Sequence, residues 1–498
     1  MHDEPPDRTL FEFLPYTVEA LKDVLKDADA GHLDYLRDYF QYYTDAGHSL
    51  TIVVESHYTD RDYLEDYAAY YVRCFEDKYK KTCRRLHFFR GHLEEKDFLP
   101  SLEPDTEVPS TEAINEQYLG FLVVRPLPHA CIGRTCLKTY ECEGRRYYPV
   151  KRRCEAHLLG HTFSVDSLPF QQQDAVAAAC ATSALWSALQ GTATLFQHKI
   201  YSPVEITTIA AKQSPGLERT FPNRGLDPPQ MANAVRAAGL EPEVVGVSRK
   251  QTLQATAYAY LHEAKIPLIM NAALFDTSFS DGPRPFDGDW DTGHAVTITG
   301  YSLGRPSAEP YPDTDTLLRS SRIDKLYVHD DGIGPFARMG LDGPDLGVVS
   351  FGEKEKSVPF TMNSSWKGLA ANAHARTVVF APDTLIIPVY HKIRVDLDAI
   401  LYEVFFLDEH DLKRSDDSAD HELEWEVFLT TQSKFKSELR RTRKFDLKTR
   451  IRLLKKSFPR FLWRAIAYCG NDPRYGLVFD ATDVAESPQL LLEILTYS

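Results

Sequence analysis

The chain has 498 residues, which is more than one hydrophobic core normally organises, so we expect two or three domains. Its 72 acidic and 57 basic residues give a formal net charge of −15, which argues against a protein that coats nucleic acid. Hydrophobic residues make up 43% of the chain, enough for sizeable cores, yet no uninterrupted apolar run approaches the roughly 20 residues needed to span a bilayer.

The first residues are acidic and proline-rich and lack the basic and apolar segments of a secretory signal. In a chain without such a signal, the eight cysteines are expected to be reduced thiols. The sequence therefore predicts a cytoplasmic protein with neither a membrane nor nucleic acid among its partners.

Residues 1–160 show the mixed pattern of an α/β accessory region and contain no chemical motif. Hydrophobic spacing predicts short amphipathic helices over residues 1–48 and a further helix from Tyr63 to Phe75. Runs of β-branched and aromatic residues predict strands at 51–55, 84–89 and 118–125.

A group of cysteines near the end of this region raises the question of a metal site. The group consists of Cys131, Cys136, Cys142 and Cys154, with His157 close behind. Their spacing differs from the paired knuckles that bind structural zinc. We therefore expect ordinary thiols here, and we predict no metal and no cofactor for the protein.

The pattern changes over residues 161–345. A strand at 161–165 leads to three glutamines and then to an alanine-rich helix with Cys180 on its first turns. Further helices are predicted over 203–213 and 227–239, and further strands at 265–271, 295–301 and 325–329.

Cys180 has the surroundings of a nucleophile. Its small neighbours leave the sulfur accessible, and the positive end of a helix dipole favours thiolate over thiol. His294 and Asp330 lie next to or near glycine at the edges of two later strands, where they can converge on the cysteine. In such a site Cys180 would attack a carbonyl carbon, His294 would transfer the proton, and Asp330 or its neighbour Asp331 would orient the imidazole.

Two glutamines before the cysteine are candidates for stabilising an oxyanion. The side-chain amide of Gln172 or Gln173 would donate to the oxygen alongside the backbone N–H of Cys180. The sequence leaves open which of the two does so.

The order glutamine, cysteine, histidine, aspartate resembles the papain-like cysteine peptidase superfamily, above all the bacteriocin-leader-processing branch and its relatives. The resemblance covers about residues 165–345 and implies an α+β fold with a papain-like catalytic domain over 161–345. It also implies a thiol hydrolase that cleaves a peptide or isopeptide bond in a protein or peptide substrate. The matching segments are Gln172-Gln173-Asp174…Cys180, Gly293-His294-Ala295-Val296 and Asp330-Asp331-Gly332-Ile333-Gly334.

The chain departs from these relatives in three ways. Their glutamine stands six residues before the cysteine, whereas Gln173 and Gln172 stand seven and eight before it. Cys180 is followed by Ala181, where many relatives have glycine or tryptophan. The separation of His294 and Asp330 is long and requires residues 304–324 to loop out.

Two other functions stay open. An acyltransferase, such as a transglutaminase-like enzyme, uses the same constellation and differs in the acceptor of the acyl group. A catalytically silent papain-like scaffold that binds a partner is the third hypothesis.

Residues 346–498 form a C-terminal accessory region with a sharp change in charge. Residues 408–426 are strongly acidic, and residues 434–464 are dominated by lysine and arginine. We expect this basic segment to be a solvated helical face that pairs with the acidic block, with docking on an anionic partner as the alternative.

Overall fold

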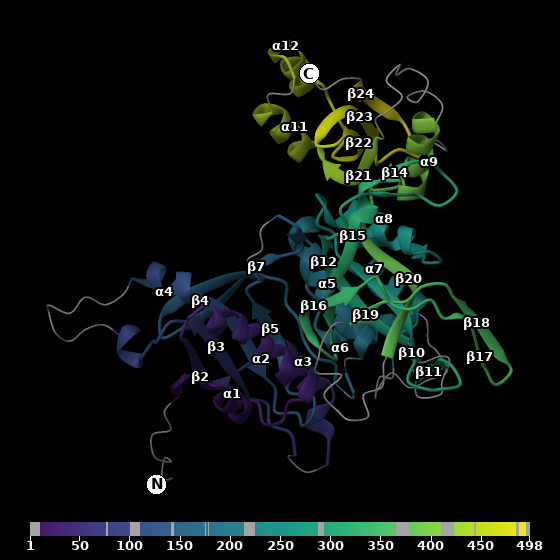
Figure 1. Ribbon diagram of the computed structural model, residues 1–498. Coiled ribbons are helices and arrows are strands. Elements are labelled where there is room, and N and C mark those ends of the chain that lie inside the picture. The colour runs from purple at the N-terminus through teal and green to yellow at the C-terminus, as the bar shows by residue number, and fades with distance from the viewer. Residues whose placement is uncertain are drawn as a thin grey trace, which may run out of the picture.

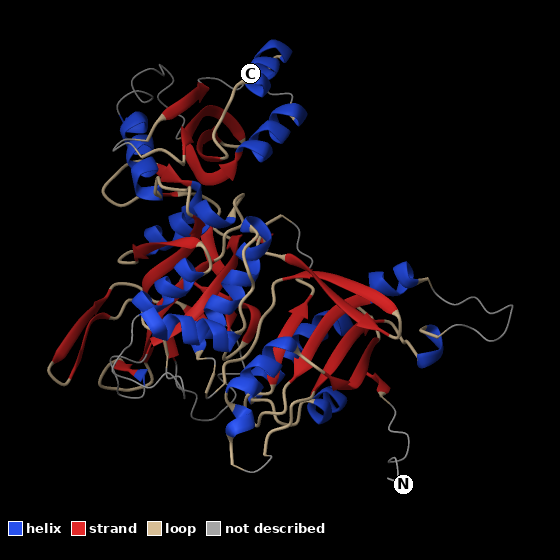
Figure 2. Cartoon of the chain, turned by 180° about the vertical axis from the view of Figure 1, so that it is seen from behind, coloured by secondary structure: helices blue, strands red, loops and turns tan. Residues whose placement is uncertain are grey.

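The computed structural model shows three bodies that follow one another along the chain (Figure 1). An N-terminal sheet lies beside a larger central sheet, and a smaller third sheet lies beyond the central body (Figures 1 and 2). The protein is therefore α+β, with sheets that are almost entirely antiparallel. The described residues are 10–75, 78–99, 110–140, 144–174, 176–177, 179–213, 225–286, 293–364, 378–409, 423–442, 445–484 and 488–494.

The N-terminal body is a five-stranded antiparallel sheet in the order β1-β2-β3-β4-β5. Helix α2 packs on this sheet through aromatic side chains: the rings of Phe40 and of Phe88 on β3 lie 4.5 Å apart. The elements are β1 (Phe11–Pro15), α1 (Val18–Val24), α2 (Ala30–Asp45), β2 (Leu50–Tyr58), α3 (Arg61–Ala69), β3 (Cys83–Arg90), α4 (Thr111–Gln117), β4 (Tyr118–Val124), β5 (Ile132–Leu137) and the hairpin of β7 (Arg152–Leu158) and β8 (His161–Ser167).

The central body is built on a sheet with the order β19-β16-β15-β12-β10-β20-β9, to which β6 and β11 add short pairings. Helices α5, α6 and α7 share a core with Ile269 and Ile386 on one face, and α8 shares a core with Leu268 and Met270 on the other. The elements are β6 (Arg146–Tyr147), α5 (Cys180–Phe196), α6 (Pro203–Gln213), α7 (Pro228–Ala237), β9 (Leu240–Gly246), α8 (Lys250–Leu261), β10 (Leu268–Asp276), β11 (Arg284–Pro285), β12 (Gly293–Leu303), β15 (Ile323–Asp330), β16 (Gly334–Gly340), β19 (Asn363–Ser364) and β20 (Val378–Tyr390).

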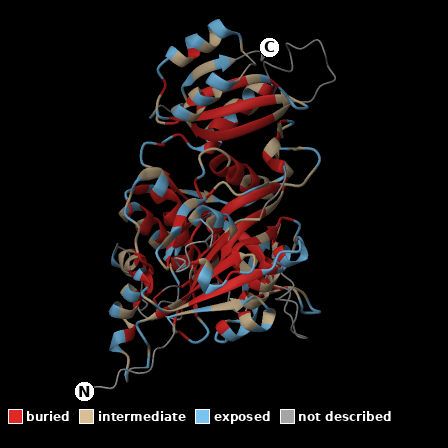
Figure 3. Ribbon diagram, turned by 90° about the vertical axis from the view of Figure 1, so that its left-hand side faces the viewer, coloured by how far each residue is buried: buried red, intermediate tan, exposed pale blue. Residues whose placement is uncertain are grey.

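Most of helix α5 is buried on all sides because it lies in the interior. Every residue from Ala181 to Ala193 is buried, and buried positions, red in Figure 3, fill the middle of the molecule. The helix ends at Gln197, which adopts the left-handed conformation. The start of α5, at Cys180, is half-open to solvent, and its last turn from Thr194 to Phe196 is exposed or half-buried.

The third body is a six-stranded sheet in the order β13-β14-β21-β22-β23-β24. Its first two strands come from the insertion between β12 and β15, which loops out of the central sheet, as expected, and adds β13 and β14 to the C-terminal sheet. The elements are β13 (Glu309–Pro310), β14 (Leu317–Leu318), α9 (Leu397–Leu407), β21 (Glu424–Thr431), α11 (Gln432–Arg441), α12 (Leu447–Lys455), β22 (Phe461–Cys469), β23 (Asp472–Asp480) and β24 (Leu490–Ile494); β17 (Gly347–Phe351) and β18 (Lys354–Val358) form a separate hairpin.

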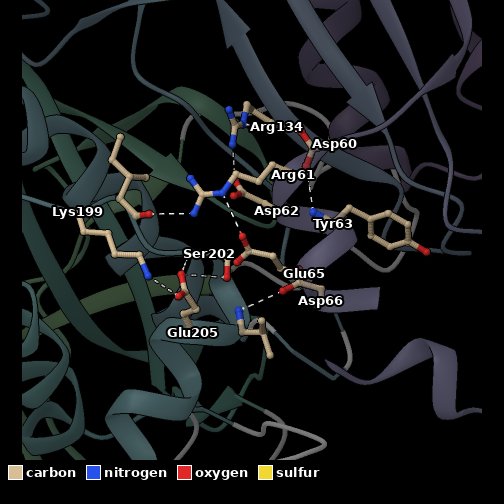
Figure 4. A network of polar contacts seen from close by, with 12 residues as sticks. Asp60, Arg61, Asp62, Tyr63, Glu65, Asp66, Arg134, Lys199, Ser202 and Glu205 are labelled. Carbon is tan, nitrogen blue, oxygen red and sulfur yellow. Dashed lines mark hydrogen bonds and ion pairs between the residues drawn. The ribbon is translucent and has the colours of Figure 1, made fainter. Parts of the chain in front are cut away.

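Polar contacts join the N-terminal body to the loop between α5 and α6 and to the first turn of α6 (Figure 4). Arg61 at the start of α3 donates to the carbonyl of Ile200 at 3.2 Å, and Asp66 accepts from the N–H of Val204 at 3.1 Å. Beside them Arg134 of β5 forms an ion pair of 2.6 Å with the buried Asp62. These contacts fix the two bodies to each other.

The structure agrees with several elements expected from the sequence. The helices expected at 203–213 and 227–239 are α6 and α7; Asp227 caps α7, and Gly239 follows its end with a φ of 81°. The central sheet, however, takes in β20 between β10 and β9, so it extends well beyond the expected domain boundary at residue 345. No helix within the described ranges is long and apolar enough to cross a membrane.

Candidate active site

Cys180 is the first residue of α5. The preceding Ala179 makes no side-chain cap hydrogen bond, and the first bond within the helix runs from Ser183 N to Ala179 O. The N–H groups of residues 180–182 therefore have no acceptor inside the helix. Free amides at a helix N-terminus stabilise a negative charge on the sulfur or on an oxygen bound beside it.

His294 and Asp330 come from two neighbouring strands. His294 is the second residue of β12, and Asp330 is the last residue of β15. The two strands run antiparallel, so both residues lie at the same end of the sheet. Helix α5 is fixed to β12 by a hydrogen bond of 2.7 Å from the Thr297 hydroxyl to the carbonyl of Ala184. This packing brings the start of α5 to the same end of the sheet.

The three side chains meet there. His294 Nε2 lies 3.0 Å from Asp330 Oδ1, and the Cys180 side chain lies close enough to the ring to contribute to its raised pKa. Because Nε2 is engaged with Asp330, Nδ1 is the nitrogen left for the sulfur. The structure thus brings together Cys180, His294 and Asp330, three of the residues expected in the site.

The charge state of His294 follows from these neighbours. Burial lowers the pKa of the imidazole, but the charge and hydrogen bond of Asp330, the bond with Cys180 and the charge of Asp331 hold the pKa well above its usual value. These neighbours therefore favour the protonated ring. A protonated imidazole beside a cysteine can pair with a thiolate and later give its proton to a leaving group.

Asp330 and Asp331 are adjacent but differ in their bonding. Burial raises the pKa of Asp330, but the charge and hydrogen bond of His294 and the N–H of Gly332 bring it below its usual value. Asp331 Oδ1 lies 3.6 Å from His294 Nε2, and burial together with the charge of Asp330 raises the pKa of Asp331 to about 6, against the opposing effect of His294. Asp330 is thus the carboxylate that hydrogen-bonds the imidazole, and Asp331 adds charge from further away.

The same three groups have a spacing that a metal ion could use. One atom each from His294, Asp330 and Asp331 lies within 4.8 Å of the others. However, the closest nitrogen and oxygen already bond each other at 3.0 Å. The donor set therefore fits a histidine with its orienting carboxylate better than a metal centre.

Gln172 is not free to act as an oxyanion donor, so this prediction is wrong. Its Nε2 donates to Asp29 Oδ2 at 2.8 Å and to the carbonyl of His129 at 3.1 Å. Its Oε1 accepts from the N–H of Ile132 at 3.2 Å. Both amide hydrogens are used, and Gln172 instead fixes the segment that leads to Cys180.

The other glutamines differ in exposure. Gln173 is exposed, and no hydrogen bond within the described residues places its amide at Cys180. Gln171, which the sequence analysis passed over, is buried, and its Nε2 has no hydrogen-bond partner there. Side chains alternate along an extended segment, so Gln171 points away from the side used by Gln172. The position six residues before the cysteine is Asp174, which accepts from the N–H groups of Val176 and Ala177 at 2.7 and 2.5 Å.

Other candidate sites do not assemble. Cys131, Cys136 and Cys154 are free and buried, Cys142 lies outside the described residues, and no metal-binding group forms around the described ones.

Among the described residues, the ion pairs of the acidic block are not with the basic segment, contrary to the expected pairing. Residues 410–422 lie outside the described residues. Of the described acidic residues, Glu424 and Glu426 lie next to Arg319, and Glu424 also next to Arg322. In the basic segment, Arg464 pairs with Glu438 of the same segment.

Comparison with known proteins adds no name to this arrangement: no family model matches the chain, and no curated protein matches it.

Proposed function

We propose that the protein is a papain-like thiol hydrolase that cleaves a peptide or isopeptide bond with Cys180, His294 and Asp330. The observation that carries the proposal is the position of His294, whose ring hydrogen-bonds Asp330 and lies near the Cys180 side chain, which contributes to its raised pKa. A cysteine that only packs in a core would not require an imidazole fixed by a buried carboxylate beside it. The position of Cys180 at the N-terminus of α5, where backbone N–H groups have no acceptor inside the helix, is a second reason.

The reaction follows from this geometry. The Cys180 thiolate attacks the carbonyl carbon, and the carbonyl oxygen takes up negative charge next to the N–H groups at the start of α5. The His294 imidazolium protonates the departing amine as the carbon–nitrogen bond breaks, which leaves a thioester. His294, now neutral, removes a proton from water, and the resulting attack on the thioester releases the carboxylic acid and regenerates the Cys180 thiolate beside the protonated imidazole. Asp330 holds the ring in one orientation throughout.

The second oxyanion donor in this proposal is Gln171. Its buried Nε2 has both hydrogens available among the described residues, in contrast to Gln172. The proposal takes the cytoplasm as the compartment, because the seven described cysteines are free thiols.

The test is labelling of the full-length protein with an electrophilic thiol probe, followed by mass spectrometry of the labelled peptide. We expect labelling at Cys180 and its loss in Cys180→Ala. In His294→Ala we expect a loss of at least about tenfold at pH 6, because the thiolate loses its paired cation. Cys469→Ala is the matched control, since Cys469 is also half-buried and free. Labelling at another cysteine, or equal labelling of His294→Ala, would overturn the proposal.

A peptide library with and without an added primary amine separates hydrolysis from acyl transfer. Free acids as the only products support the hydrolase, whereas amides of the added amine identify the acyltransferase alternative.

A further inference from the structure

Helix α2 of the N-terminal body packs against the turn that carries Asp330. This turn, residues 330–335, joins β15 to β16. The Tyr35 hydroxyl donates to the carbonyl of Pro335 at 2.5 Å, and His32 Nε2 lies 2.9 Å from the carbonyl of Asp331. The backbone of the turn is thus held by side chains from nearly 300 residues earlier in the chain.

Glycines on both sides allow this close approach. A Cβ at Gly31 would lie 3.2 Å from the carbonyl oxygen of Gly332. A Cβ at Gly334 would lie 2.7 Å from the ring of Tyr35, and Gly334 has a φ of 159°. Larger residues at these positions would push the helix and the turn apart.

The peptide between Asp331 and Gly332 links His32 to the triad. Its carbonyl accepts from His32 Nε2, and its N–H donates to Asp330 Oδ1 at 3.0 Å. The same Oδ1 atom bonds His294 Nε2 at 3.0 Å. A continuous series of hydrogen bonds therefore runs from His32 through one peptide group to Asp330 and His294.

The start of α2 also holds the segment before the nucleophile. Asp29, the residue before the helix, accepts from Gln172 Nε2 at 2.8 Å. Nearby, Arg125 donates to the carbonyl of Gln172 at 2.9 Å. The start of α2 thus contacts both the turn of the triad carboxylate and the segment that leads to Cys180.

His32 cannot serve as a proton carrier in this arrangement. It is 2% exposed, and burial lowers its pKa, although the charges of Asp29 and Asp330 and the bond to Asp331 oppose this effect and Arg125 adds to it. The ring is therefore neutral at pH 7. A carbonyl only accepts, so the proton of the neutral ring is on Nε2.

We propose that His32 is a positioning residue of the active site: it orients the Asp331–Gly332 peptide, whose N–H holds Asp330 Oδ1 toward His294. This inference rests on the proposed function. Through His32, the N-terminal body forms part of the catalytic arrangement.

The test measures alkylation of Cys180 by iodoacetamide in the full-length protein between pH 5 and 9, which requires no knowledge of the substrate. We expect His32→Ala to lower the rate at pH 6 by about tenfold, the effect of one pKa unit, and to approach the wild-type rate near pH 9. His32→Gln, whose amide can donate to the same carbonyl, should restore most of the rate. Thermal unfolding of each variant confirms that it is folded.

The matched control is His161→Ala, which removes a comparable bond of 2.9 Å to the carbonyl of Phe98 elsewhere in the N-terminal body. We expect its alkylation profile to match the wild type. In an Asp330→Asn background, His32→Ala should have no further effect, because His32 acts through Asp330. A wild-type profile for folded His32→Ala, or full additivity with Asp330→Asn, would refute the positioning role.

These outcomes are distinct from failure of the proposed function. If His294→Ala also leaves the alkylation of Cys180 unchanged, the triad itself is refuted. If His294→Ala lowers the rate and His32→Ala does not, only the role of His32 is refuted.

Discussion

The N-terminal and C-terminal bodies both pack on the central sheet, but they do so at different places. The N-terminal body reaches the candidate active site through His32, Tyr35 and Asp29. The C-terminal sheet meets α8, on the opposite face from α5, where Tyr258 hydrogen-bonds Glu426. We infer that contacts of the first kind adjust catalysis, whereas contacts of the second kind stabilise the fold.

Asp330→Asn should have the largest effect, because it alters the residue on which the contacts of α2 converge. We expect kcat to fall by about 10²–10⁴-fold, as for other triads with a changed orienting acid. The charge of Asp330 raises the pKa of His294, so its removal lowers that pKa and shifts the alkaline limb of kcat/KM to lower pH. The measurement is a pH–rate profile, and an unshifted alkaline limb would contradict this role.

Gln171→Ala should have the next largest effect. Loss of one oxyanion donor costs about 10²–10³-fold in kcat, with little change in stability. Gln172→Ala is the matched control: it leaves Asp29 and the N–H of Ile132 without their partner and should cost about 1–3 kcal/mol of unfolding free energy. If kcat falls more in Gln172→Ala than in Gln171→Ala, our assignment of the donor is wrong.

A pair of Tyr→Phe substitutions compares the two interfaces directly. Tyr35→Phe removes the bond to the turn at Pro335, and we expect a few-fold slower alkylation of Cys180 at pH 6. Tyr258→Phe removes the bond to Glu426 and should cost about 1–3 kcal/mol of stability without changing alkylation. Equal effects of both substitutions on Cys180 would remove the distinction between the two bodies.

Asp331→Asn should have the smallest effect on activity. Its effect on stability should depend on pH. Folding raises the pKa of Asp331 to about 6 from an ordinary 3.8, so this carboxyl destabilises the fold as pH rises from 4 to 6 and above. The neutral variant should therefore gain stability above pH 6, by at most about 3 kcal/mol, and no such gain below pH 3.8. Denaturant unfolding at pH 5 and pH 8 measures this, and the same gain at both pH values would rule out the linkage.

Local patterns made part of this structure predictable. The spacing of apolar residues and the Asp227 cap located α6 and α7, and the alanine-rich run located the helix that begins at Cys180. The strand edges at His294 and Asp330 were likewise visible, and the structure brings these three side chains together. Each of these patterns is local: it is contained in a short run of neighbouring residues.

The contacts of α2 with the site could not be predicted in this way. His32 lies 299 residues from Asp331 and bonds a backbone carbonyl, which any residue at position 331 would supply. Gln172 was assigned the wrong role because the sequence does not show that Asp29 uses its amide. The central sheet extends beyond the expected boundary at residue 345 because it includes β20. Only the pairing of β20 with β10 and β9, which are distant in sequence, places it there.

The contribution of two strands from the second body to the third sheet has a consequence for truncated forms of the protein. Strands β13 and β14 belong to the C-terminal sheet but are encoded between β12 and β15. A fragment that begins after residue 345 therefore lacks them, and β21, with the buried Trp425, becomes the edge strand. An uncovered apolar edge pairs with other chains, so we expect such a fragment to aggregate rather than to fold as a separate domain.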